Sequence, residues 1–149
     1  MNEAYSIDEI NKATESYYKK SRNNKGITIN ITGKVPSKSS SRRIIFNRRT
    51  NRPMVISSKE VLQYEKDFAS QITSKHKNTF SPEARLKVSI NWYTDSLRQD
   101  IDAPAKAIFD NLQKNKVIKN DNRIDEYKIT RMIDKRNPRV DIFIEAKDE

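Results

Sequence analysis

The sequence predicts a protein of mixed α+β class. Three observations support this: a length of 149 residues, several short segments in which β-branched residues alternate with polar ones, and two longer segments with apolar residues at helical spacing. We expect a small mixed β-sheet packed with two main helices, in the order β-β-α-β-α-β-β. An N-terminal helical extension, residues 1–26, is expected to precede a single domain at 27–149.

The N-terminal extension reads as an amphipathic helix over residues 6–22. Ser6 followed by Glu9 fits a capping box, in which each side chain accepts a hydrogen bond from the other residue's backbone N–H. Apolar and aromatic residues then recur at helical spacing, at Ile7, Ile10, Tyr17 and Tyr18. Asn23, Asn24 and Gly26 are expected to end this helix.

The first half of the domain begins with the alternating segment ITINITG at 27–33, which predicts a strand. Residues 34–52 are rich in Ser and Arg and predict a loop or a ragged β-ribbon that is mobile until it meets its ligand. PMVI at 53–56 predicts a brief strand. A second capping box, Ser57 with Glu60, is expected to begin a helix that continues to about residue 76.

The second half contains a strand, a helix and two closing strands. Residues 86–92 alternate between apolar and polar and predict a strand with one buried face. The next helix is expected to start near Asp102, since Pro104 is tolerated only in a first turn, with an apolar stripe of Ile101, Ala105, Ile108 and Leu112. Strands at 124–133 and 139–145 are expected to form a hairpin through the turn DKRNP.

The positive charge is concentrated in one window. The chain has a net charge of +10, and residues 27–59 carry eight Lys or Arg and no acidic residue. The flanking segments are nearly balanced, with five basic against four acidic residues before the window and seventeen against sixteen after it. A polyanion is the natural partner of such a segment, because a purely solubilising surface mixes its signs.

Several function classes are excluded by composition. There is no Cys, so disulfides, thiolate zinc sites and a Cys nucleophile are ruled out. The two glycines cannot form a phosphate-binding loop of the Walker type, and the polar surroundings of the only histidine, His76, argue against a His-based triad. No apolar run approaches the about 20 residues of a membrane span, and the N-terminus lacks a secretory signal, so we expect a cytoplasmic protein with no membrane partner.

Three aspartates form the candidate chemical site. Asp100 and Asp102 lie where a buried strand gives way to a helix, and residues two apart in extended backbone project to the same side. Two carboxylates so placed can bind a hard cation such as Mg²⁺. Lys106, one turn later, can lean over the same site, and Asp121 can return to the same end of the sheet as a third ligand.

The pattern by itself leaves a simpler interpretation open. Asp pairs in loops are commonly helix caps or solvated charges, and Asp102 could be the N-cap of its helix. Asp110, two turns further along, is interpreted as a surface or pairing charge.

The stretch DIDAPAKAIFDNLQKNKVIKND resembles the RusA-type Holliday junction resolvases, and the resemblance extends over about residues 27–146. That family carries a D-x-D-N-x-x-K motif at a helix start. Asp100, Asp102 and Lys106 match its charged positions, and Asp121 matches the essential aspartate of a later acidic pair whose other position is Asn120. Ala103 stands where the family has Asn, followed by Pro104, and residues 1–26 have no counterpart in the compact members.

The resemblance implies a homodimer that binds four-way DNA junctions and nicks two opposed strands symmetrically, in DNA recombination and repair. It implies Mg²⁺, or Mn²⁺ in its place, held by Asp100, Asp102 and Asp121, with Lys106 as a further catalytic residue. Small resolvases of this type are often carried by phages and prophages.

The basic window supplies the expected DNA contacts, which would hold phosphates and contribute little base readout. They are Lys34, Lys38, Arg42, Arg43, Arg48, Arg49 and Arg52. Three alternatives stay open. The first is a junction binder that does not cut, which the replacement of the family's Asn by Ala103 favours. The others are a nuclease acting on flaps, forks or single strands, and an interaction module whose N-terminal helix binds a partner protein.

Overall fold

A computed structural model describes residues 6–12, 26–37 and 42–147. Residues 7–12 are helical, and the first capping box is confirmed: the Ser6 N–H donates to Glu9 Oε2 at 3.0 Å and the Glu9 N–H to Ser6 Oγ at 3.2 Å. Most of the expected helix at 6–22 lies outside the described residues. In the part of the chain that the structure describes, no helix is long and apolar enough to cross a membrane.

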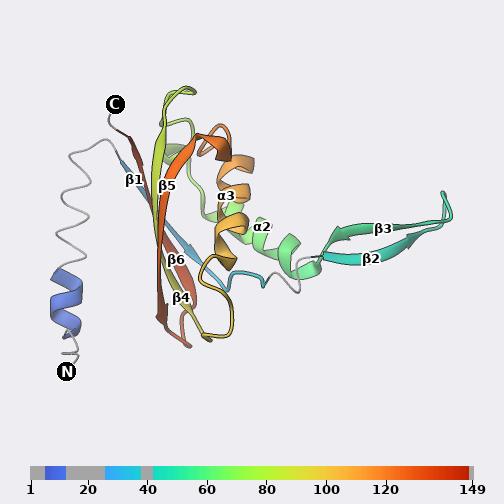
Figure 1. The fold of residues 1–149 in the computed structure, drawn as a ribbon, viewed down its shortest axis with the longest axis horizontal. Coiled ribbons are helices and arrows are strands. Elements are labelled where there is room, and N and C mark those ends of the chain that lie inside the picture. The colour runs from blue at the N-terminus through green and yellow to red at the C-terminus, as the bar shows by residue number, and fades with distance from the viewer. Residues whose placement is uncertain (1–5, 13–25, 38–41, 148–149) are drawn as a thin grey trace.

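The body of the protein is a four-stranded sheet, which confirms the mixed α+β class (Figure 1). Its strands are β1 (Ile27–Thr32), β4 (Leu86–Thr94), β5 (Ile124–Ile133) and β6 (Arg139–Ala146). Their order across the sheet is β1-β6-β4-β5, with β4 and β5 parallel and the other neighbours antiparallel.

The expected hairpin between the last two strands is wrong, because β4 lies between β5 and β6. Their burial explains the order. Val140, Ile142 and Ile144 bury one face of β6 and Phe143 buries part of the other, which suits a central strand. Residues 125–128 of β5 are exposed, which suits an edge.

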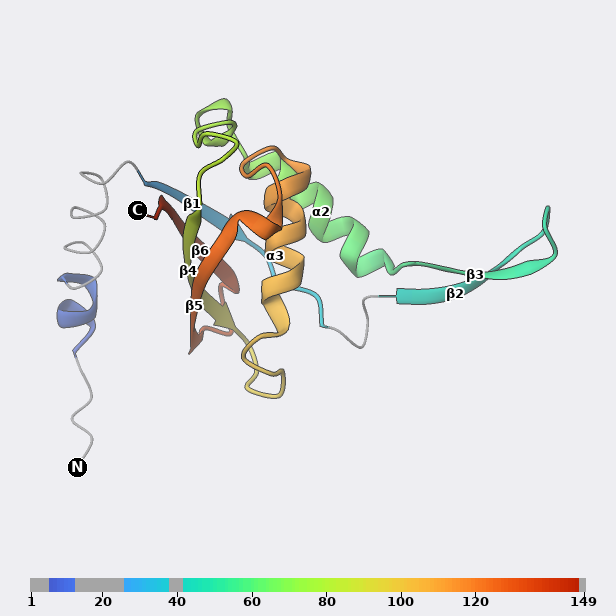
Figure 2. The same cartoon turned by 45° about the horizontal axis from the view of Figure 1, so that its top comes forward.

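Two helices, α2 (Lys59–Gln71) and α3 (Ala103–Lys114), cover one face of the sheet (Figures 1 and 2). The core lies between them and the sheet, and its largest fully buried side chains include Phe68, Trp92, Ile108, Leu112 and Ile142. The opposite face of β4 carries the alternate residues Lys87, Ser89, Asn91 and Tyr93, which are only partly buried.

Helix α2 differs from expectation at both ends. Ser58, not Ser57, is its N-cap and accepts the Val61 N–H at 3.2 Å, because Ser57 is still paired in a strand. The helix ends at Gln71 rather than near residue 76, and a short 3₁₀ helix, η2 (Ser74–His76), follows. The Gln71 amide bonds to the backbone N–H and C=O of Thr32, at 2.8 and 3.2 Å, which ties α2 to the end of β1.

Helix α3 starts where the sequence predicts. Asp102 occupies the N-cap position, Pro104 lies in the first turn, and Ala105, Ile108 and Leu112 are buried. Ile101 is the exception to the predicted stripe, since it precedes the helix and is exposed. After the helix, Lys116 adopts a positive φ of 59°, and the buried pair Val117 and Ile118 returns the chain to the core.

Residues 42–57 of the basic window form a two-stranded ribbon that stands away from the body (Figures 1 and 2). It consists of β2 (Arg42–Asn47) and β3 (Arg52–Ser57), paired antiparallel and separate from the main sheet. Pro53 is tolerated in β3 because a strand with only one neighbour leaves half of its N–H groups unpaired. Of the two expected alternatives, loop and ribbon, the structure therefore has the ribbon, and three strands rather than the expected two precede α2. Residues 38–41 lie outside the described part.

Candidate functional site

Asp100 and Asp102 lie on the loop that leaves the carboxyl end of β4 and enters α3, and both are exposed. Contacts with neighbouring elements hold this loop. The Asp134 N–H donates to the Thr94 carbonyl at 2.9 Å, and Lys34 Nζ lies 3.0 Å from Asp95 Oδ2. The carboxylates are thus presented to solvent by a loop that is fastened at its start.

Arg131, on β5, is a further contact to this loop that the sequence did not reveal. Its Nη1 donates to the Gln99 carbonyl, immediately before Asp100. Its guanidinium lies over the Trp92 ring, 5.7 Å from the centroid. No sequence signal marks this role, because Arg131 and Gln99 are 32 residues apart.

Asp121 lies at the other end of the β4-α3-β5 connection from Asp100 and Asp102. It begins the 3₁₀ helix η3 (Asp121–Arg123), directly before β5, and its N–H donates to Gln113 Oε1 in the last turn of α3 at 3.2 Å. Asp102 precedes the first turn of the same helix. A helix of 12 residues is about 18 Å long, so this length separates the two aspartates.

The sheet register leads to the same separation. β4 and β5 are parallel, with Leu86 beside Ile124 at one end and Thr94 beside Ile133 at the other. Asp121 therefore precedes the amino ends of these strands, whereas Asp100 follows their carboxyl ends. Figure 2 shows the loop before α3 and the loop after it at opposite ends of the helix.

The expectation that Asp121 returns to the same end of the sheet is wrong for a single chain. Across residues 6–12, 26–37 and 42–147, no group of three or more His, Asp or Glu side chains could hold a metal ion. The physical reason is the crossover itself, since the helix between two parallel strands must run antiparallel to them and so carries the chain back to their amino ends.

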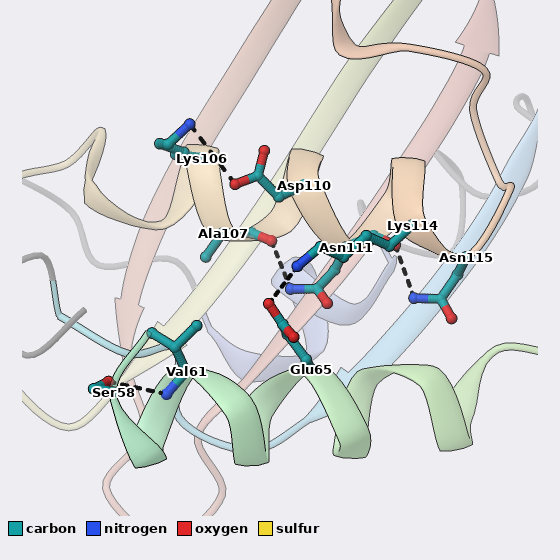
Figure 3. Close-up of polar contacts among 9 residues, drawn as sticks. All are labelled: Ser58, Val61, Glu65, Lys106, Ala107, Asp110, Asn111, Lys114 and Asn115. Atoms are coloured by element: carbon teal, nitrogen blue, oxygen red, sulfur yellow. Dashed lines mark hydrogen bonds and ion pairs between the residues drawn. The ribbon is translucent and has the colours of Figure 1, made fainter. Parts of the chain in front are cut away.

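Lys106 points along its helix rather than toward Asp102. Its Nζ lies 3.7 Å from Asp110 Oδ2, one turn further on (Figure 3). This ion pair confirms the interpretation of Asp110 as a pairing charge. Both side chains are substantially exposed, so the pair is weak and Lys106 can exchange Asp110 for another anion at little cost.

The expected DNA contacts gather on the ribbon. Arg42 and Arg43 are on β2, Arg48 and Arg49 are at its tip, and Arg52 begins β3; all five are exposed. Asn47 shapes the tip, where its Oδ1 accepts the backbone N–H groups of Arg49 and Thr50. Lys34 lies apart from this group and pairs with Asp95, while Lys38 lies outside the described residues.

Neighbouring cations lower the pKa of two carboxylates near the loop before α3. A hydrogen bond from Lys34 lowers the pKa of Asp95, and one from Arg139 lowers the pKa of Asp134. Arg139 also lies over the Tyr93 ring, 3.7 Å from its centroid. The carboxyl end of β4 thus combines ionised acidic groups with three nearby cations, Lys34, Arg131 and Arg139.

The four-stranded sheet, the exposed aspartates after β4 and the detached basic ribbon define a small α+β protein with a surface suited to a polyanion. A family model described as endodeoxyribonuclease RusA matches residues 34–145. The match includes most of the chain, and the protein belongs to the RusA family. No curated protein matches it. Family membership implies an endonuclease that resolves Holliday junctions, and it implies branched DNA as the ligand.

Proposed function

We propose that this protein is a metal-dependent endodeoxyribonuclease that resolves four-way DNA junctions by paired, symmetric nicks. The observation that carries the proposal is the family match over residues 34–145, a span that contains Asp100, Asp102, Lys106, Asp121 and the arginines of the ribbon. A symmetric dimer suits such a substrate, because it presents two identical sites to two symmetry-related strands.

The separation of the aspartates favours a dimer in which each site takes residues from both chains. One chain offers Asp100 and Asp102 at one end of α3 and Asp121 at the other. Two chains whose α3 and β5 run antiparallel about a two-fold axis would bring Asp121 of each toward Asp100 and Asp102 of the other. β5 is an edge strand, and its outer N–H and C=O groups offer a surface for such pairing.

Oxygen ligands from three carboxylates suit Mg²⁺ or Mn²⁺, and the proposed ligands are Asp100, Asp102 and the partner chain's Asp121. A divalent ion bound there would activate water and offset charge on the phosphodiester. Lys106 is exposed at the start of α3, and turning from Asp110 to a phosphate would place its positive charge beside the reacting group. Arg131 holds the Gln99 carbonyl and so positions Asp100.

The ribbon accounts for binding to DNA of any sequence. Its five arginines lie on a projecting element with no acidic residue, and such contacts to phosphates position a protein without reading bases. We therefore assign general affinity to Arg42, Arg43, Arg48, Arg49 and Arg52.

The test is a cutting assay on a labelled synthetic four-way junction and a linear duplex of the same sequence, each with Mg²⁺ and with EDTA. Paired nicks in the junction alone, lost with EDTA and in Asp102→Asn, are expected. Tight junction binding without cutting would replace the proposal with a binding protein. Cutting of flaps and forks at the same rate as junctions would make it a nuclease of broader specificity.

A further inference from the structure

The ribbon has two different faces, and the pairing register defines them. Residues directly opposite each other on an antiparallel pair point to the same side, and successive pairs alternate. One face carries Ile44 opposite Val55 and Phe46 opposite Pro53, which we call the apolar face. The other face carries Ile45 opposite Met54 and Arg43 opposite Ile56.

The apolar face is open to solvent. Ile44 is 74% exposed, Val55 59% and Phe46 58%, whereas Ile45 and Met54 on the other face are 36% and 40% exposed. Side chains of this size normally become buried, and a contiguous exposed group of them marks a contact surface. The ribbon stands away from the body in both views, so the apolar face has no partner in the sheet or its helices (Figures 1 and 2).

Charge identifies the partner. Arg48 and Arg49 at the tip and Arg42 at the root bracket the apolar face, and residues 42–57 contain no acidic residue. A second copy of this chain would bring its own arginines to the contact. A nucleic acid offers phosphates to the arginines, and it also offers the flat faces of its bases to the apolar side chains.

We propose that the apolar face of the ribbon, with Phe46 as its aromatic side chain, contacts the bases at the branch point of the DNA junction. This inference rests on the proposed function, and it names the residues that would make the protein prefer branched DNA over a duplex. The arginines hold phosphates in duplex and junction alike. Bases inside a duplex are stacked on both sides, while bases at a branch can leave the stack at lower cost and present a face to an aromatic ring.

The proposal assigns affinity and selectivity to different residues of one ribbon. Removing an aromatic ring from a stacked base weakens binding by about 5- to 150-fold. Phe46→Ala should therefore weaken junction binding by a factor in this range and leave duplex binding within about twofold. Removing a phosphate contact, in Arg49→Ala, should weaken binding to both DNAs by similar factors and reduce the salt dependence of both.

The experiment measures the dissociation constants of the full-length protein in EDTA, which prevents cutting, for a four-way junction and a linear duplex of the same sequence. The variants are Phe46→Ala, Phe46→Trp and, as a matched control on the opposite face, Ile45→Ala. We expect Phe46→Ala alone to lose the junction preference and Phe46→Trp to retain it. A junction with 5-iodouracil at the branch should crosslink to the peptide that contains Phe46, and one with the label about one helical turn away should not.

Each other outcome overturns the inference in a recognisable way. If the parent prefers the junction and Phe46→Ala keeps that preference, the apolar face is not the source and the proposed function stands. If Ile45→Ala loses the junction preference to the same extent, both substitutions damage the ribbon. The crosslink to the parent protein then decides, and its absence would refute the contact. A fall in molecular mass in Phe46→Ala would make the face an interface between chains. A parent that binds junction and duplex equally well would refute this inference, and the cutting assay with Mg²⁺ would still decide the proposed function.

Discussion

Asp141 lies on the sheet face that the helices leave open, opposite Asn30 on β1 and Asn91 on β4. Burial raises the pKa of this carboxyl above its ordinary value of 3.8, and Arg139 only partly offsets the effect. A raised pKa in the folded state means that the charged form is disfavoured there. Its penalty is absent below the unfolded pKa and grows as pH rises through the folded pKa.

Asp141→Asn is therefore expected to raise the melting temperature at pH 7, because the neutral amide carries no such penalty. The gain should shrink as the pH falls toward 3.8, where the native carboxyl is protonated as well. Thermal melts of both proteins between pH 3 and pH 7 would check this. A variant that is less stable at pH 7 would mean that the ionised carboxylate makes a stabilising contact.

Tyr64 is buried in the core, where its ring meets Phe68 edge to face at a centroid distance of 6.0 Å. Its hydroxyl has no hydrogen-bond partner within the described ranges, and burial raises its pKa. Tyr64→Phe is expected to increase the free energy of unfolding by about 1 kcal/mol, since it removes an unpaired buried polar group. Urea denaturation measures the change.

Phe68→Ala provides the contrast to this substitution. It removes a fully buried ring from the same helix face and is expected to lower the free energy of unfolding by about 3–5 kcal/mol. A Tyr64→Phe protein that is less stable than the parent would show that the hydroxyl is bonded in solution.

The ribbon is the element whose removal should separate binding from folding. Its ends, Arg42 and Ser57, are paired across the ladder, so a short Gly-Ser linker in place of residues 43–56 can join them. We expect the free energy of unfolding to change by no more than about 0.5 kcal/mol, because the element lies outside the core. Junction affinity at about 0.1 M salt should fall at least tenfold, as the linker removes four arginines. Unfolding of the shortened protein would show that the ribbon supports the body.

Helix α3 allows a similar separation for Lys106. The exposed pair with Asp110 contributes at most about 0.5 kcal/mol, so Lys106→Ala should leave stability nearly unchanged. Because Lys106 is proposed to act near the phosphate, the same substitution should lower the cutting rate by about 10²-fold. Asp110→Ala is the control, since it breaks the same ion pair and should keep the rate. If Lys106→Ala cut DNA as fast as Asp110→Ala, Lys106 would have no role in the proposed site.

At the scale of the whole molecule, the two-chain site can be tested by mixing inactive proteins. Asp102→Asn and Asp121→Asn are each expected to be inactive alone. In a mixed dimer, one composite site would contain both substitutions and the other would contain neither. Combining the two proteins should therefore restore nicking of one strand per junction, with up to about half of the dimers being mixed when equal amounts exchange freely. If each site belonged to one chain, no mixed dimer would have an intact site, and activity would stay absent.

Local patterns determined much of this protein. The alternating segments predicted β1, β4, β5 and β6, because side-chain periodicity is a property of a few consecutive residues. The Ser6 capping box, the helix start near Asp102 and the Asp110 pairing charge follow from equally short spacings. The charge count placed the DNA-binding prediction on residues 34–52, and the aspartate–lysine pattern identified the family.

The tertiary structure alone decided how these pieces are placed. Strand order depends on contacts between distant residues, and β6 pairs with β4 and β1 instead of forming the expected hairpin with β5. The same order made β4-α3-β5 a parallel crossover, so Asp121 lies about one helix length from Asp102. Sequence spacing brings carboxylates together only when the chain turns back at the right end of an element. Here the intervening helix carries Asp121 to the far end, so the common site that we propose requires a second chain.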